Sequence, residues 1–151
     1  MIPEIGHLLL IAALVVSFVG SVLPFFDLAS KKSYSQSYIK PFSIFLFLLI
    51  FFSFLTLIYS FLVDDFSLTY VAENSNTLLP NYFKFAATWG AHEGSLVLWT
   101  LCISLWLVAF IYSKKEVDNA FTSVTFGIMS QVIFAFLIFT LLTSNPFERL
   151  L

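Results

Sequence analysis

Four long runs of apolar residues alternate with short polar segments along the chain. Crossing about 30 Å of hydrocarbon takes about 20 helical residues. The pattern therefore predicts four transmembrane helices, near residues 5–25, 41–63, 95–112 and 121–143. We expect Pro41 in the first turn of the second helix, where a missing amide hydrogen costs nothing. Asn145-Pro146 should end the fourth, because the residue before a proline is pushed out of helical geometry.

The segment between the second and third runs is too long for a simple connector, and it is rich in aromatic residues. Alternation at Phe66, Leu68 and Tyr70 predicts a short extended piece. Aromatic rings favour the headgroup zone of a membrane, so a second cluster predicts an interfacial helix, at Tyr82, Phe83 and Phe85.

Composition agrees with an all-α integral membrane protein. The 151 residues are 60% hydrophobic and only 11% charged, against about 25% charged in globular domains. A net charge of −2 without a basic patch gives no sign of nucleic-acid binding. The single cysteine, Cys102, rules out a disulfide within the chain and a Cys-x-x-Cys site, and we expect it to pack as a small hydrophobic side chain.

Positive charges predict the orientation of the four helices. Lysines are found in the first link, at Lys31, Lys32 and Lys40, and in the third link, at Lys114 and Lys115. The long middle segment has only Lys84 among its acidic residues. The positive-inside rule then places this segment and both termini outside, in the periplasm of a bacterium or the intermembrane space of a mitochondrion. Glu4 and the absence of lysine or arginine before the first run argue against a cleaved signal peptide.

The most unusual stretch is residues 89–99, Trp-Gly-Ala-His-Glu-Gly-Ser-Leu-Val-Leu-Trp, at the start of the third run. An ionisable residue beside hydrocarbon is by default a functional-site hypothesis. Helical spacing would place Trp89, His92 and Trp99 on one face. Gly90 and Gly94 would form a GxxxG pair that lets another helix approach closely.

Several roles for His92 are compatible with the residues alone. It could bind a metal or haem iron, relay protons with Glu93, or anchor the helix end on a backbone carbonyl. His7 could join it as the second axial ligand of a b-type haem, or be simply solvated. Two histidines and one buried cysteine are too few for a metal site of three or four ligands, so none is expected. No catalytic residue is indicated.

Four segments of the chain resemble the N-terminal part of the CcmF/NrfE family, the large membrane subunit of the cytochrome c haem lyase. They read Met-Ile-Pro-Glu-Ile-Gly at 1–6, Asp-Phe-Ser and Tyr-Val-Ala-Glu-Asn-Ser-Asn within 65–76, Ala-Thr-Trp-Gly-Ala-His-Glu-Gly-Ser-Leu at 87–96, and Thr-Ser-Asn-Pro-Phe at 143–147. The resemblance runs from the first residue to the last. It marks a set of structural or docking residues: Tyr70, Glu73, Asn74, Ser75, Trp89, Gly90, His92, Glu93, Gly94, Ser95 and Trp99.

The resemblance implies a role in cytochrome c maturation in the bacterial inner membrane, or in the mitochondrial one if the gene is organellar. Proteins of this family receive haem from the carrier CcmE. They attach it through thioether bonds to the Cys-x-x-Cys-His thiols of apocytochrome c, with CcmH-type and, in some lineages, CcmI-type partners.

The chain departs from the family pattern in length. Family members are several times longer, and their tryptophan-rich WWD domain and haem-ligating histidines lie beyond the matched part. None of those ligands can be transferred to His7 or His92. We therefore expect a truncated or split piece of a larger multi-helix protein that is not a lyase alone.

Two other functions stay open on the sequence. One is a non-enzymatic four-helix membrane scaffold. The other is a small transporter or proton relay built on His92 and Glu93. The relay would need polar residues at mid-membrane, and the candidates are Ser53, Thr56, Ser104, Ser130 and Gln131.

Overall fold

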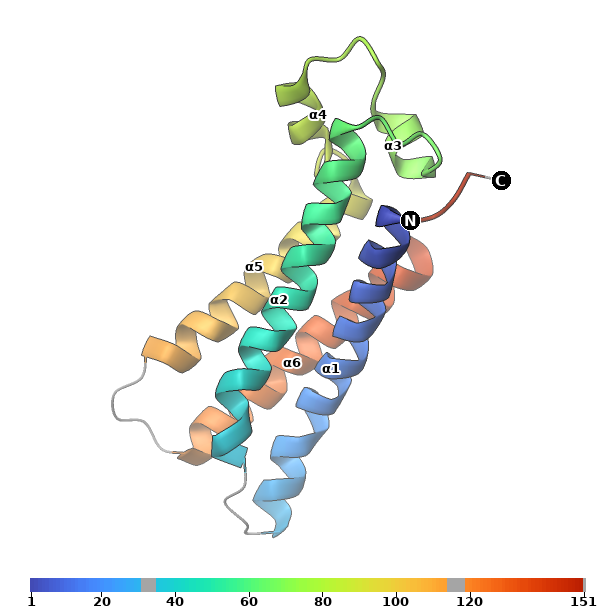
Figure 1. Cartoon of the computed structure of the whole chain (residues 1–151). Helices are drawn as coiled ribbons and strands as arrows, with labels where there is room; N and C mark the ends of the chain where they lie inside the picture. Colours follow the sequence, from blue (N-terminus) through green and yellow to red (C-terminus); the bar gives the residue numbers. More distant parts are fainter. Residues whose placement is uncertain (31–34, 114–118, 151) are drawn as a thin grey trace.

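The computed structural model describes residues 1–30, 35–113 and 119–150, and its regular elements are helices (Figure 1). They are α1 (Ile2–Ser30), α2 (Ser35–Leu62), α3 (Thr69–Asn74), α4 (Asn81–Ala87), α5 (His92–Ser113) and α6 (Asn119–Thr143). Four of these, α1, α2, α5 and α6, are long and apolar enough to cross a membrane. The predicted all-α fold with four apolar spans is confirmed.

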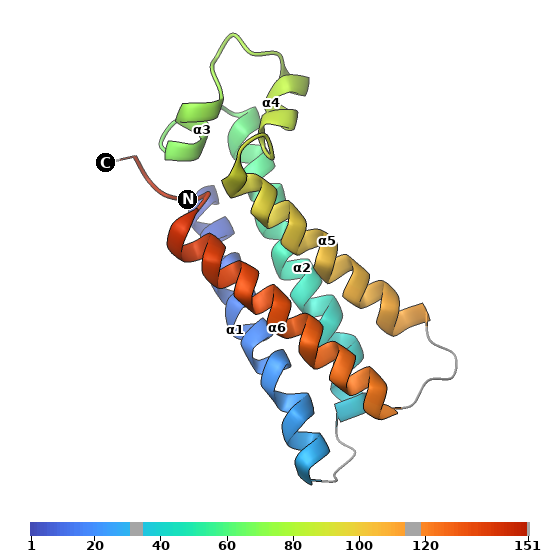
Figure 2. The same cartoon turned by 180° about the vertical axis from the view of Figure 1, so that it is seen from behind.

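The four long helices pack as a ring in the order α1, α2, α5, α6. Helix α1 lies against α2 and α6, and both of these also pack against α5, as the two opposite views show (Figures 1 and 2). Both chain termini lie at the end of the bundle that carries α3 and α4. The termini and the middle segment therefore share one end of the bundle, while their side of the membrane stays a prediction.

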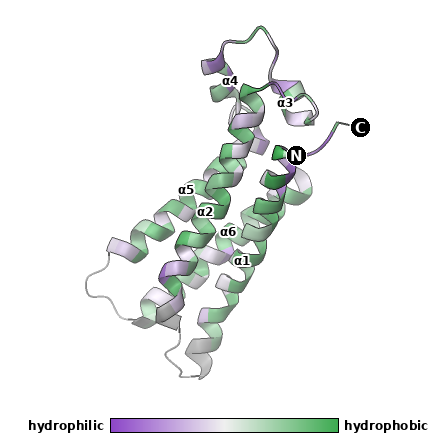
Figure 3. Cartoon of the chain, viewed as in Figure 1, coloured by the Kyte–Doolittle hydropathy of each residue, from purple (hydrophilic) through white to green (hydrophobic). Residues whose placement is uncertain are grey.

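Small hydroxyl side chains lie between the long helices, among buried leucines and phenylalanines. Most of them bond to a carbonyl one turn back on their own helix, as Thr100 Oγ1 does to Leu96 O at 2.8 Å. Ser53 Oγ instead donates across to Gly6 O of α1, at 2.9 Å. Small residues let helices approach closely in a membrane. Hydropathic colouring shows apolar helices with polar residues concentrated near their ends (Figure 3).

Some predicted helix ends are wrong. Helix α2 begins at Ser35, so Pro41 lies inside the helix instead of in its first turn. Helix α1 continues past Phe25 to Ser30. Helix α5 begins at His92, so part of the 89–99 stretch forms its first turn. These helices continue with polar residues beyond the apolar run, which hydropathy does not detect. The end of α6 at Thr143, before Asn145-Pro146, is confirmed.

One other prediction is corrected by the surface of the bundle. Cys102 is exposed on α5 and is not packed in the core.

Of the lysines predicted to face inside, Lys40 is exposed on α2, with its Nζ atom 5.8 Å from the centre of the Tyr112 ring. The others lie outside the described residues, at positions 31, 32, 114 and 115.

The middle segment folds into α3 and α4. The predicted helix containing Tyr82, Phe83 and Phe85 is confirmed as α4. The predicted extended piece is wrong for Tyr70, which lies in α3. Among the described residues of the predicted extended piece, Leu68 makes an antiparallel bridge with Arg149.

Candidate functional site

One end of the bundle is closed by residues 63–91 together with residues 144–150 and the first turn of α1, which we call the cap (Figure 1). The cap contains most of the residues that the sequence singled out. Its contacts join segments that are far apart in the chain, and they are described here segment by segment.

Tyr70 is the centre of the cap. It is buried in α3, its ring lies edge-on to Phe61 with centroids 5.1 Å apart, and its hydroxyl donates to the Thr88 carbonyl oxygen at 3.0 Å. Thr88 is itself fully buried in the turn between α4 and α5. A longer hydrogen bond from the same hydroxyl reaches the Ala87 carbonyl oxygen at 3.4 Å. Tyr70 therefore ties α3 to the turn before the third span.

The Thr88 carbonyl group lies so close to Gly94 that a side chain at position 94 would not fit. A Cβ atom on Gly94 would overlap Thr88 O and lie 2.6 Å from Tyr70 Oη. Gly90 is exposed, lies before α5 begins, and has ordinary space around it. The GxxxG interpretation is therefore wrong for this pair, because Gly94 makes room for the α4–α5 turn of its own chain.

Burial raises the pKa of the Tyr70 hydroxyl, and the charge of Glu93 acts in the same direction. The backbone N–H groups of Ala91 and Gly94 oppose the shift. The net effect keeps the hydroxyl protonated. It can therefore act as a hydrogen-bond donor to Thr88 throughout the physiological pH range.

A buried ion pair joins α4 to the end of α2. Lys84 Nζ lies 2.5 Å from Asp64 Oδ2, and only 6% of the lysine side chain is exposed. Asp64 has a φ of 56°, the left-handed region that aspartate tolerates better than most residues. Sequence reasoning missed this pair. A lysine within an aromatic segment was the available signal, because a buried lysine needs a partner.

His92 and Glu93 open α5 side by side. His92 Nδ1 lies 3.4 Å from Glu93 Oε2, a close contact without hydrogen-bond geometry, and the two side chains are 68% and 22% exposed. Glu93 lies in the first turn, where the helix dipole favours a negative charge. Ser95 Oγ donates to His92 O at 3.0 Å. Because its side chain is largely exposed, the His92 ring points outward from the start of α5.

The predicted common face of Trp89, His92 and Trp99 is wrong for Trp89. Trp89 precedes α5, and its ring lies edge-on to Phe85 with centroids 4.9 Å apart. Trp99 lies on α5 two turns after His92 and is 64% exposed. The two tryptophans therefore have different surroundings, one in the cap and one on the outer surface of the bundle.

The family segment at the end of α3 has mainly local contacts. Asn74 Nδ2 donates to Tyr70 O at 2.9 Å, and the Ser75 amide donates to Val71 O at 2.9 Å. Glu73 is exposed. Ser75 Oγ is buried without a hydrogen-bond partner among the described residues. These residues shape the end of α3 next to Tyr70.

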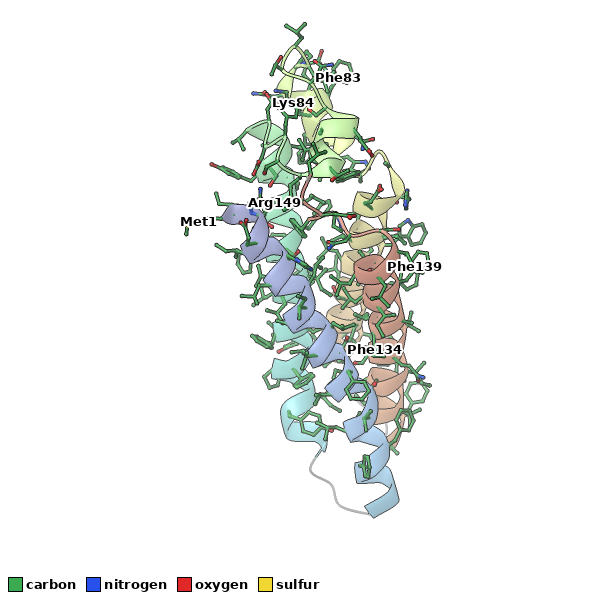
Figure 4. All side chains as sticks on the ribbon, turned by 90° about the vertical axis from the view of Figure 1, so that its right-hand side faces the viewer. Met1, Phe83, Lys84, Phe134, Phe139 and Arg149 are labelled. Carbon is green, nitrogen blue, oxygen red and sulfur yellow. The ribbon has the colours of Figure 1, made fainter. Side chains whose placement is uncertain are left out.

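The last described residues complete the cap. Phe147 is buried against Gly6 of α1, where a Cβ atom would overlap both its ring and Thr56 Oγ1. The Thr69 amide donates to Glu148 O, and the Leu150 amide to Ser67 O, both at 3.0 Å. Arg149 pairs with Glu4 and Ser67, and Figure 4 shows it beside the first turn of α1. All four family segments thus meet in the cap.

His7 lies in α1 and His92 begins α5, and no haem site is shown among the described residues. The described cavities, of about 540, 390 and 320 Å³, are lined by other residues and none by histidine. Within the described part of the chain, no three His, Cys, Asp or Glu side chains are grouped as a metal ion would require.

Comparison with known proteins gives consistent results. No family model matches the chain. The cytochrome c-type biogenesis protein NrfE of Haemophilus influenzae is 41% identical over 150 residues, which is 99% of this chain and 24% of the relative. The CcmF proteins of Pseudomonas aeruginosa and Escherichia coli are each 42% identical over 151 residues, all of this chain and 23% of each relative.

A solved structure, described as Cytochrome c Heme Lyase CcmF, matches all of this chain with a TM-score of 0.88 and 27% identity, over 25% of its own length. Fold and site together define a multi-pass membrane segment related to cytochrome c biogenesis proteins. More particularly, the chain is homologous to the N-terminal portion of the CcmF and NrfE cytochrome c haem lyase proteins. It spans about a quarter of the length of the relatives it matches.

Proposed function

We propose that this chain is the N-terminal membrane module of a CcmF-type haem lyase, which joins haem covalently to apocytochrome c. One observation carries the proposal. The four family segments, spread from residue 1 to residue 147, converge in one cap: the first contacts the fourth, the second contacts the third, and Glu148 and Leu150 join the two pairs. A shared fold alone would not require these particular side chains to meet.

In this proposal the module is embedded in the bacterial inner membrane with the cap on the periplasmic side, where apocytochrome thiols are available. The positive-inside pattern supports that orientation. The position of both termini beside the cap is consistent with it.

The haem-handling chemistry belongs to the rest of the protein in this proposal. The remaining CcmF portion carries the WWD domain and binds haem delivered by holo-CcmE. CcmH-type and CcmI-type subunits present apocytochrome c. This module fixes the positions of the remaining CcmF helices relative to the cap, so that haem and the apocytochrome thiols are held close together in the right orientation.

The test is reconstitution of the two parts as separate polypeptides. In a strain without its own lyase, the chain is produced with a WWD-bearing remainder from a relative, and covalent haem in a reporter cytochrome c is measured by haem stain and absorbance. We expect holocytochrome only when both parts are present. Equal maturation without the chain would contradict the proposal, as would no maturation with both parts in the membrane.

A non-enzymatic scaffold is the second candidate, and one observation favours it. Tyr70 and Gly94, within the family segments, contact residues of this same chain and line none of the described cavities. A scaffold predicts that His92→Ala and Glu93→Ala leave cytochrome c maturation unchanged and disturb the assembly of a partner. Blue native electrophoresis of the same strains would show that loss of assembly.

A further inference from the structure

Gln131 is a polar side chain in the middle of a membrane span. It is the twelfth of the 24 residues of the span Ala120–Thr143, so it lies near the centre of the hydrocarbon. It is exposed on the surface of α6, and it has no hydrogen-bond partner among the described residues. An amide carries two donor hydrogens and an acceptor oxygen, and lipid tails satisfy neither.

This side chain lines a groove of about 540 Å³ between α1 and α6. The groove is built mainly from rings and an aliphatic side chain, and its lining is Phe18, Ser21, Val22, Phe25, Phe26, Gln131 and Phe134. The ring centroids of Phe18 and Phe134 lie 5.2 Å apart, so the two rings pack α1 against α6. Figure 4 shows Phe134 at mid-height of the bundle. The α6 side of the groove, at Gln131 and Phe134, is therefore at the depth where water is scarcest, and the α1 side continues to Phe26 at the end of the first span.

The other polar side chain of the lining is already satisfied. Ser21 Oγ donates to Phe18 O of its own helix at 2.7 Å. Exposed threonines of α6 do the same, as Thr125 Oγ1 does to Phe121 O at 2.8 Å. Among the described lining residues, the Gln131 amide is thus the polar group that still needs a partner from outside.

We propose that this groove holds a transmembrane helix from the part of the CcmF-type protein that lies outside this chain, and that this helix presents a hydrogen-bonding side chain to Gln131. The inference rests on the proposed function. In the solved CcmF relative, this four-helix unit accounts for only 25% of the chain, so the other three quarters are available as the source. Polar side chains hydrogen-bond across helices in membranes, where alternatives are scarce.

The first test is retention of the remainder by the affinity-tagged chain in detergent, with both produced together. Gln131→Leu should weaken retention by about threefold to tenfold, the range for one interhelical hydrogen bond. Gln131→Asn, which keeps the amide, should retain more than the leucine variant. Ser21→Ala is the matched control in the same groove, and it should bind like wild type because its hydroxyl bonds within α1.

The second test identifies the occupant. Benzoyl-phenylalanine replaces Phe25, and photolysis is followed by mass spectrometry of the cross-linked peptides. We expect a cross-link to a membrane-spanning segment of the remainder. Cross-links to lipid alone, or between two copies of this chain, would overturn the inference.

The outcomes separate this inference from the proposed function. If cytochrome c matures and Gln131→Leu retains the remainder as wild type does, the inference is wrong and the proposed function stands. If wild type and remainder together give no holocytochrome, the proposed function fails. The leucine variant alone should melt like wild type, since no described residue bonds to Gln131; a large drop in its melting temperature would instead show a role within this chain and overturn the inference.

Discussion

Replacing Gly94 with alanine is the sharpest perturbation of the cap. The new methyl group would overlap the Thr88 carbonyl oxygen and approach Tyr70 Oη to 2.6 Å. The carbonyl belongs to the backbone of a buried turn, so it cannot rotate away as a flexible side chain would. The turn between α4 and α5 must move, and the hydrogen bond from Tyr70 must lengthen or break.

Opposing effects set the size of the change. Overpacking a buried site costs about 1–3 kcal/mol, and losing the Tyr70–Thr88 hydrogen bond costs about 1 kcal/mol more. Alanine is a better helix former than glycine, by about 1 kcal/mol in a helix interior and by less in the first turn. The steric cost dominates. We expect the variant to be less stable by about 2 kcal/mol, which lowers Tm by about 4–8 °C for a chain of this size.

Thermal unfolding in detergent, followed by circular dichroism, measures this loss. Gly90→Ala is the matched control, because a Cβ atom there meets its nearest neighbour at an ordinary 3.4 Å. Its Tm should stay close to wild type. Equal destabilisation by the two substitutions would refute the reasoning and revive a GxxxG packing role. A Gly94→Ala variant as stable as wild type would refute it directly.

Three further predictions concern the same cap, and all use Tm in detergent. Lys84→Met removes the cation that pairs with the largely buried Asp64. The free energy of unfolding should fall by about 3 kcal/mol, the low end for breaking a buried ion pair, because Asp64 is partly exposed. Adding Asp64→Asn should recover part of the loss. Because burial raises the pKa of the Tyr70 hydroxyl, the unfolded chain releases that proton first as pH rises. The associated stability should be complete below about pH 10 and decline above it, and Tyr70→Phe should lack this decline. Gly6→Ala overlaps the Phe147 ring and should destabilise, and the loss should be smaller in a Phe147→Leu background.

The positions of the four spans could be predicted because hydrophobic runs report directly on membrane crossing. Helix ends could not, as α2 shows. Helix α2 begins six residues before Pro41, in a polar stretch. Backbone hydrogen bonds can continue a helix through such a stretch, but a hydropathy pattern does not detect it. The hydrophobic pattern predicts where the chain crosses the membrane, and the helix can extend beyond that crossing.

The segments of the candidate site could be predicted, but their contacts could not. Tyr70 finds Thr88 across 18 residues, and Lys84 finds Asp64 across 20. Gly94 looked like half of a helix-packing motif because spacing alone cannot distinguish a neighbouring helix from a folded-back turn. Periodicity describes which face a residue occupies, whereas these partners depend on how the middle segment folds over the bundle.

The strand-like contact between residues 67–69 and 148–150 gives this unit an order of assembly. The Thr69 amide donates to Glu148 O, and the Leu150 amide donates to Ser67 O. Arg149 also pairs with Glu4. During synthesis these partners emerge only after α6, and closing so long a loop carries an entropic cost that only the finished bundle offsets. The side of the cap formed by residues 67–69 therefore closes last. Protection of this segment from protease in a nascent chain would mark the moment when the fourth span has been inserted.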